Sequence, residues 1–284
     1  RTIQRPAVNL AGRFSAPLPN AAMRTTSSTG ASAKRPAGIA GLVLMAVLGV
    51  HPLVGAAGDV DEAFGTALVR GDVADAVGLL QAGADPNIRL GHGKTALMAA
   101  AKAGAVELAS GLIRRGADVN ATNDNGGTAL MFAAIPGHLE TMTLLVDHGA
   151  DVNAFAHFHW TALMVAASKG HGGGVRLLLR SGADPNVQDT YGWTPLMRAV
   201  YGNKHDAAAA LLEDERLDLE VRDERGATAL HVAVERGRSA LVARLLARGA
   251  DPRSIDDAGR GLRHKASVQG FHEIAAMLEA RKAH

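Results

Sequence analysis

The sequence predicts an all-α fold, a solenoid of stacked helical repeats, from its composition and from internal repetition. The chain is 47% hydrophobic but only 4% aromatic, and small aliphatic side chains suit closely packed helices better than a β-sandwich or barrel. A Thr-Ala/Pro-Leu phrase recurs at intervals of 33, 33, 33 and 34 residues, beginning at Thr95, Thr128, Thr161, Thr194 and Thr228. A period of this length is typical of solenoids, in which neighbouring units bury the apolar faces that one unit cannot bury alone.

A second phrase keeps the same register as the first. It reads Gly-Ala-Asp-Pro/Val-Asn and begins at Gly83, Gly116, Gly149 and Gly182, and it returns as GADPR from Gly249. A 33-residue period with these two phrases resembles the ankyrin repeat. The resemblance covers about residues 59–284. It implies helix–turn–helix units with hairpin-like finger loops, and partners that dock on the finger tips and the concave helix face.

The residues of one repeat show why each part should form. The hydroxyl of Thr161 can cap the free N–H groups of a helix that begins there, and Leu163 with alanines after it gives an apolar stripe. Gly182 ends the second helix in the left-handed conformation that glycine adopts at little cost. The His of the family phrase is kept at His231. Methionines replace it in the other copies, where we interpret them as packing residues: Met98, Met131, Met164 and Met197.

The repeats divide the folded part of the chain into three regions. We expect an N-terminal cap at 59–88, five full repeats at about 89–255 and a C-terminal cap at 256–284, in which Arg263, Lys265 and Glu279 suit a solvated surface. EDERLDLE (213–220) replaces one Gly-Ala-Asp turn with an extra residue, which predicts a local irregularity. Three glycines at 172–174 predict a helix start that frays, because glycine weakens helices.

Residues 1–57 have the character of a leader rather than of a repeat. Lys34-Arg35 precedes an apolar stretch at 37–50, and small residues follow near Ala56, which is the organisation of a secretory signal peptide. The first methionine is Met23, so the true start could lie there. A periplasmic or secreted protein is the expectation. The alternatives are an uncleaved leader that anchors the chain in a membrane, and an organellar transit peptide.

The charge distribution argues against a nucleic-acid partner. Six of the 30 basic residues and none of the 28 acidic residues precede residue 58, so residues 58–284 carry 24 basic and 28 acidic residues, a formal net charge of −4. A nucleic-acid-binding domain needs a basic face on its folded part. The basic excess instead belongs to the leader.

No catalytic motif is complete, so we do not expect an enzyme. The chain has no cysteine, which excludes thiolate nucleophiles and cysteine-ligated metals. HGGG at 171–174 resembles a lipase oxyanion loop, but there is no Gly-x-Ser-x-Gly elbow. His138 and His171 occupy the Gly-His position of the family repeat and are interpreted as structural.

His157 and His159 form the one pair that suggests a metal site. A His-x-His pair on an extended finger could place both rings on one side, with Asp124 or Asp189 on a neighbouring finger as a further ligand. In register, however, His159 stands where the other copies have glycine, at a turn position that favours positive φ. We therefore expect no metal and no cofactor, and keep metal or small-ligand binding through these two histidines as an alternative.

Aromatic residues gather on two consecutive fingers and give the strongest functional signal. Trp160 and Trp193 occupy the same position, immediately before the threonine, and are the two tryptophans of the chain. Aromatic and arginine side chains are enriched in interface hot spots. The alternative is that the two indoles stack on each other and stiffen the fingers. The predicted partner-binding residues are His157, Phe158, Trp160, Tyr191, Trp193, Arg198 and Tyr201.

These observations predict a non-catalytic, monomeric scaffold that is exported from the cytoplasm and binds an unidentified protein partner. A secreted effector or toxin-related protein acting on a host or competitor protein is the alternative in the same fold. The repeats themselves do not identify the partner, because one scaffold serves many ligands.

Overall fold

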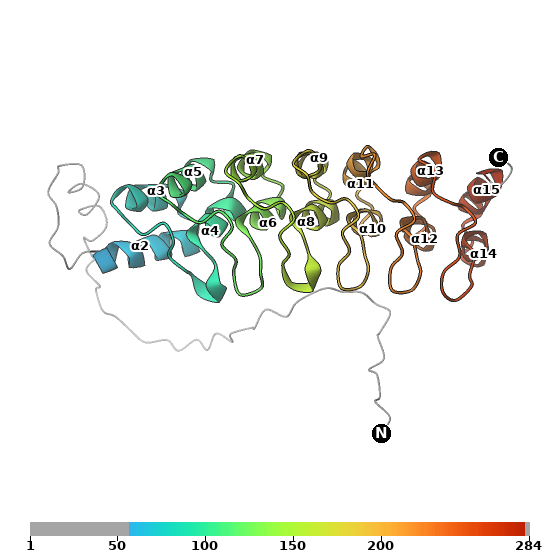
Figure 1. Ribbon diagram of the computed structural model, residues 1–284, viewed down its shortest axis with the longest axis horizontal. Helices are drawn as coiled ribbons and strands as arrows, with labels where there is room; N and C mark the ends of the chain where they lie inside the picture. Colours follow the sequence, from blue (N-terminus) through green and yellow to red (C-terminus); the bar gives the residue numbers. More distant parts are fainter. Residues whose placement is uncertain (1–56, 282–284) are drawn as a thin grey trace, which may run out of the picture. The chain divides into compact units, whose positions relative to one another are not determined.

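The computed structural model describes residues 57–281, which contain fourteen α-helices and no β-strand (Figure 1). The predicted leader lies outside the described residues apart from Ala57, with which the first described helix begins. Within the described residues, no helix is both long enough and apolar enough to cross a membrane. The prediction of an all-α solenoid is confirmed.

The helices form two rows, with the finger loops projecting beyond one of them (Figure 1). The first helix of each repeat lies in the inner row, next to the fingers, and the second lies in the outer row. The described chain starts with α2 (Ala57–Arg70) and α3 (Val73–Gln81). The inner helices that follow are α4 (Ala96–Ala103), α6 (Ala129–Ala134), α8 (Ala162–Lys169), α10 (Pro195–Tyr201), α12 (Ala229–Glu235) and α14 (Leu262–Val268). The outer helices are α5 (Val106–Arg114), α7 (Leu139–Asp147), α9 (Gly172–Arg180), α11 (His205–Leu212), α13 (Ser239–Ala247) and α15 (His272–Ala280).

The repeated threonines begin the inner helices, as predicted. The Thr161 hydroxyl accepts a hydrogen bond from the N–H of Met164 at 3.3 Å, and Thr95, Thr128 and Thr194 make the same bond in their own repeats. Methionine at the third helical position is buried in each of these repeats, which confirms its role in packing. Each cap therefore fixes the start of a helix whose next residues enter the core.

Asparagine side chains join consecutive repeats. Each amide donates to a carbonyl in the turn of the next repeat, and its oxygen accepts the N–H of the aspartate two residues after that carbonyl, at 2.8–3.2 Å. The asparagines are Asn87, Asn120, Asn153 and Asn186. This ladder uses both polar ends of one side chain, so it fixes the spacing and the rotation between repeats.

A second ladder joins the finger tips. The N–H of His157 donates to the carbonyl of Asn125 at 2.8 Å, and the N–H of Thr190 donates to the carbonyl of Phe158 at 3.1 Å. Equivalent bonds link the other neighbouring tips between His92 and Asp257. Inside three fingers the chain also forms single antiparallel bridges, including Ala156 with Trp160. The fingers, defined here by the ranges 87–94, 120–127, 153–160, 186–193, 220–227 and 253–260, thus form a continuous edge.

The turn at 213–220 is irregular, as its sequence predicts. Gly116, Gly149 and Gly182 have positive φ in the other turns, whereas no residue from 213 to 220 has positive φ. Arg216 pairs with Asp214 at 2.7 Å, and its guanidinium also reaches the carbonyl of Leu179 in the preceding repeat. Side-chain bonds to the backbone therefore replace the glycine turn.

The prediction that the start of α9 frays is wrong. The helix is regular from Gly172. A Cβ on Gly172 would lie 2.8 Å from the carbonyl oxygen of Asp206, and one on Gly174 would lie 3.2 Å from Met142. Close packing against the neighbouring repeats, rather than a loose helix end, therefore explains these two glycines.

The C-terminal repeat contains a buried charge cluster where a solvated cap was predicted. Arg263 and Glu279 do pair at the surface, but Lys265 is only 7% exposed, with Nζ 2.6 Å from Glu235 and 2.9 Å from Asp256. Burial would raise the pKa of Asp256, but hydrogen bonds from Arg260 and Lys265 outweigh it and hold that pKa well below its ordinary value. The cluster joins α14 to the preceding repeat through ion pairs.

Next to this cluster, His231 is fully buried in α12. Its Nδ1 lies 3.2 Å from the N–H and 3.0 Å from the hydroxyl of Thr228. Burial and the nearby Lys265 lower the pKa of His231 from 6.5 to about 4. The folded chain therefore holds a neutral imidazole at neutral pH.

Replacing His231 with Met, the residue of the other repeats, should remove a pH dependence of stability. Between pH 6.5 and about 4 the unfolded chain binds a proton at His231 and the folded chain does not. As the pH is lowered through this range, the free energy of unfolding should therefore fall by up to about 1.4 kcal/mol per pH unit. Urea unfolding at several pH values should show a shallower slope for His231→Met. Equal slopes would contradict a neutral, buried His231.

Candidate functional site

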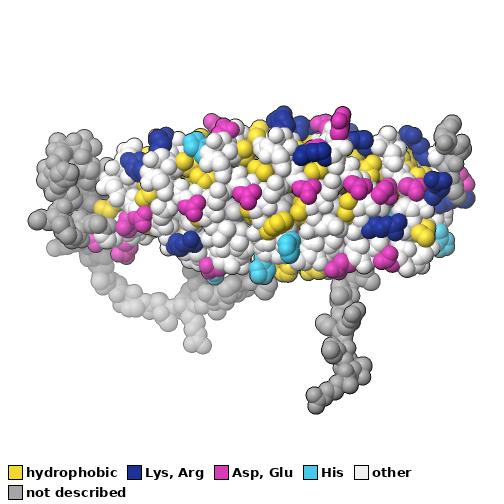
Figure 2. Space-filling view, in the orientation of Figure 1, with side chains coloured by type: hydrophobic (Ala, Val, Ile, Leu, Met, Phe, Trp, Pro, Cys, Tyr) yellow, Lys and Arg dark blue, Asp and Glu magenta, His cyan; other side chains and the backbone are white. Residues whose placement is uncertain are grey.

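The predicted aromatic residues come together on two fingers and one inner helix. Phe158 and Tyr191, at equivalent tips, stack with ring centroids 6.4 Å apart and are 54% and 46% exposed. Trp193, at the end of the next finger, meets Tyr201 of α10 edge to face at 5.2 Å. Because α10 follows directly on the 186–193 finger, the two groups belong to one surface. Figure 2 shows histidine and hydrophobic side chains gathered at the edge where the fingers project, below a line of acidic side chains.

A buried ion pair holds the centre of this surface. The Asp189 side chain is fully buried and accepts from Nε of Arg198 at 2.9 Å, and from its Nη2 as well. The other carboxylate oxygen accepts the N–H groups of Tyr191 at 2.9 Å and Trp193 at 3.0 Å. One carboxylate therefore fixes both the turn of the finger and the arginine of the helix behind it.

Arg198 in turn positions both tryptophans. Its guanidinium carbon lies 4.9 Å from the ring centroid of Trp160 and 4.7 Å from that of Trp193. Cation–π contacts of this kind are worth about 0.5–2 kcal/mol each, more when shielded from water. The alternative that the two indoles stack on each other is wrong, because the faces of both rings contact the guanidinium. Asp189, Arg198, Trp160 and Trp193 are called the arginine clamp below.

Cations and aromatic rings alternate beyond the clamp. Arg236, just after α12, lies 3.8 Å from the ring centroid of Tyr201. At the other end, Lys94 lies 5.6 Å from the ring of Phe132. Lys94 and Trp160 occupy the same position before the repeat threonine, and Phe132 and Arg198 the same position in the next inner helix. The same two positions thus form a cation–ring contact in both places, but the cation is on the finger in one pair and on the helix in the other.

Beside the clamp lies an apolar hollow of about 330 Å³ between the 120–127 and 153–160 fingers. Its residues come from both fingers and from the inner helices behind them. Predicted site residues His157, Phe158 and Trp160 line it. So do Met131, which the sequence analysis interpreted as a packing residue, and three residues that it did not single out: Phe132, Ile135 and Val165. Ile135, directly after α6, is 39% exposed.

The two histidines do not converge on one point. The ring of His157 packs edge to face on Phe158 at 5.0 Å, and that of His159 on Phe155 at 5.3 Å. Asp189, which was considered as a further metal ligand, forms an ion pair with Arg198. No three His, Cys, Asp or Glu side chains in residues 57–281 lie together as a metal site would require.

The predicted backbone strain at His159 is confirmed and extends to its neighbour. His159 has φ of +58°, and Phe158 has φ of +60°. The register identified His159, because glycine stands there in the other repeats, but it gave no such sign for Phe158. Non-glycine residues in this region are strained, and such strain tends to occur where function requires a particular side-chain direction.

The fold defines a helical-repeat protein whose finger loops form one continuous edge, and comparison with known families agrees. The pattern of the family described as ankyrin repeats (3 copies) matches residues 65–156, 112–189 and 163–256. The chain belongs to the ankyrin-repeat family. No curated protein matches the chain.

Truncating Arg198 should loosen both tryptophans and destabilise the fold. Arg198→Ala leaves a buried, unpaired carboxylate at Asp189, which typically costs about 3–5 kcal/mol. Since Trp160 and Trp193 are the two tryptophans, fluorescence quenching by acrylamide reports on the clamp directly, and quenching should increase. Arg236→Ala is the matched control, because Arg236 is exposed and contacts only Tyr201's ring in the described contacts. If both variants behaved alike, the clamp would have no special role.

Replacing His159 with glycine should stabilise the fold by up to about 1 kcal/mol, because it removes the cost of a left-handed histidine. The control is His157→Gly. His157 has no positive φ, so glycine should lower the stability there by making the unfolded chain more flexible. Thermal unfolding of both variants measures the difference. A lower stability for His159→Gly than for His157→Gly would show that the turn is not strained.

Proposed function

We propose that the chain is a non-catalytic, monomeric binding protein that recognises a protein partner through the arginine clamp and the adjoining finger tips. Ankyrin repeats generally mediate protein–protein interaction. The partner-binding residues of this proposal are those predicted from the sequence, His157, Phe158, Trp160, Tyr191, Trp193, Arg198 and Tyr201, together with Phe132, Ile135 and Val165 of the hollow.

The observation that carries the proposal is a half-exposed aromatic surface held in place by a buried ion pair. Phe158 and Tyr191 are about half exposed, and the tryptophans behind them are partly exposed. Such rings offer large contact areas. Since the clamp fixes them before binding, little conformational entropy remains to be lost on association. A purely structural cluster would gain more from burying the rings than from leaving them at the surface.

The polar groups of the same surface support binding rather than catalysis. The Asp189 carboxylate is saturated by two backbone N–H groups and a guanidinium. A general base needs a lone pair within reach of the substrate proton, and a buried, fully bonded carboxylate does not offer one.

Export is the second part of the proposal, and the sequence of residues 1–57 supports it. A basic stretch, an apolar core and small residues near Ala56 have the order of a secretory signal, so a periplasmic or secreted location follows. Sequencing the N-terminus of the mature protein tests this part alone. A new N-terminus close to Ala57 is expected, and a chain that keeps its leader would favour the membrane-anchored alternative.

The binding surface is tested by site-specific photo-crosslinking in the producing cells. A photoreactive amino acid replaces Phe158 at the finger tip or, as control, Arg180 on the outer helix α9, which is also exposed. Mass spectrometry of the products should identify a protein crosslinked from position 158 and absent from position 180. Identical products from both positions would contradict the proposal.

The variant Trp160→Ala/Trp193→Ala provides the second test of the surface. In a background that keeps the crosslinker at position 158, it should remove the specific product, because it takes away both rings of the clamp. Circular dichroism establishes whether the variant is still folded. Unchanged crosslinking in a folded variant would mean that the partner does not use these rings.

A further inference from the structure

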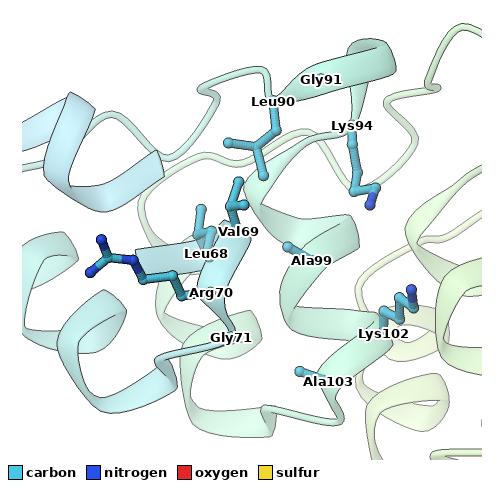
Figure 3. Close-up of a pocket in the computed structure, with 10 residues that line it drawn as sticks. All are labelled: Leu68, Val69, Arg70, Gly71, Leu90, Gly91, Lys94, Ala99, Lys102 and Ala103. Atoms are coloured by element: carbon cyan, nitrogen blue, oxygen red, sulfur yellow. The ribbon is translucent and has the colours of Figure 1, made fainter. Parts of the chain in front are cut away.

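A second hollow lies two repeats nearer the N-terminus, and its charged residues are all basic. It measures about 470 Å³ and is lined by the end of α2, the start of the next finger and one side of α4. Figure 3 shows Lys94 and Lys102 on the α4 side, with Val69, Leu90 and Ala99 facing the space between the helices. Arg70 completes the charged residues of the lining, and no acidic residue of the described chain belongs to it. Asp72 lines an adjoining crevice of about 20 Å³ that shares Leu68, Gly71, Ala99 and Ala103 with this hollow.

Lys94 connects this basic hollow with the apolar hollow beside the clamp. The lysine lines the first hollow, and its ammonium lies over the ring of Phe132, which lines the second. The basic hollow lies between α2 and α4, and the apolar one lies between α6 and α8. The two hollows are therefore neighbouring parts of one concave surface.

The exposed charges of the inner helices from α4 to α12 are basic. These helices contain Lys102 and Lys169, which are exposed, together with Arg198, which is paired with Asp189, and Glu235, which is paired with Lys265. Residues 58–284 nevertheless carry a formal net charge of −4. The helix side of the concave surface near the basic hollow is therefore positive although the domain as a whole is acidic.

On the basis of the proposed function, we propose that the partner segment on this surface is an extended acidic peptide with one bulky apolar side chain. The apolar side chain occupies the hollow of Phe132, Ile135 and Val165. Its acidic residues lie against Arg70, Lys94 and Lys102. The chain's own N-terminal segment has the wrong charge for this role, because residues 1–57 contain six bases and no acid.

The spacing of the hollows sets the spacing within the peptide. Packed helices lie about 8–10 Å apart, and the two hollows are two inner-helix intervals apart, or about 16–20 Å. An extended chain advances about 3.3 Å per residue. The apolar anchor and the acidic group should therefore be separated by about five or six residues.

A display selection tests this inference with defined probes. The full chain serves as bait for phage that display random peptides about twelve residues long, twice the predicted spacing. The enriched peptides should contain more acidic than basic residues, with an apolar residue about five or six positions from the acidic group. The synthetic form of the most enriched peptide should bind more weakly as salt is raised, because salt screens exposed charges.

Charge reversal then locates the binding. Arg70→Glu/Lys102→Glu should weaken binding of that peptide about tenfold or more, and Ile135→Ser should weaken it while leaving the salt dependence unchanged. Arg180→Glu/Arg244→Glu, on the outer helices α9 and α13, makes the same change of net charge and should have little effect. All four positions are exposed, so the folds of both double variants can be compared by circular dichroism.

The inference is overturned if no peptide is enriched, if the enriched peptides are basic or uncharged, or if the outer-helix variant weakens binding equally. Its failure differs from failure of the proposed function. If a protein is crosslinked at position 158 but the display selection does not enrich acidic peptides, only the proposal of an acidic peptide is wrong. Acidic peptides that bind the chain, with no protein crosslinked at 158, would place recognition at the N-terminal hollow and contradict the clamp surface.

Discussion

The close approach of consecutive inner helices is the constraint on which the rest of the structure depends. Alanines at repeated positions are buried at the helix contacts, for example Ala100, Ala133 and Ala166 at 1% exposure or less. Their small side chains allow the apolar stripes of neighbouring repeats to meet, and no single repeat could bury its stripe alone. Because the helices are this close, the finger loops are also close enough to hydrogen-bond from tip to tip, and the asparagine ladder fixes the same spacing at the first residue of each finger that begins with asparagine.

The arginine clamp depends directly on that spacing. Arg198 reaches back to a tryptophan of the preceding finger and to one of its own, which is possible only when neighbouring fingers are held at a fixed separation. The buried Asp189 compensates the charge that would otherwise make this arginine costly to confine. At Lys94 and Phe132 the same two positions are occupied with the chemistry exchanged. The repeats therefore provide a fixed pair of facing positions, and the individual residues placed there decide what the surface can recognise.

The sequence predicted those features of the fold that depend on register within one repeat. Thr161 as a cap, Met164 as a core residue, the left-handed His159 and the irregular turn at 213–220 all follow from comparing one copy with the next. Features that depend on the contact between copies were missed or misjudged. Gly172 was expected to weaken a helix, whereas it admits the backbone of the next repeat. Lys265 was expected at the surface, whereas two carboxylates of other segments surround it.

The candidate site divides in the same way. Its aromatic residues could be predicted because they share one position in consecutive repeats. The role of Asp189 could not, because its partner lies nine residues further along and the pairing depends on how the finger meets the helix. Ile135 and Val165 stand at ordinary helix positions, and only the separation of two fingers makes them the floor of a hollow. Comparison of the repeats therefore identified the aromatic residues of the surface. The structure was needed to find the apolar residues behind them and the ion pair that holds them.

The central claim is that the partner docks on the concave face between the fingers and the inner helices. Hydrogen exchange of the full chain, with and without the protein recovered by crosslinking, tests this claim most directly. Protection on binding should be concentrated in residues 123–135, 155–165 and 189–201. Protection confined to the outer helices α5, α7 and α9, with the fingers unchanged, would contradict the account.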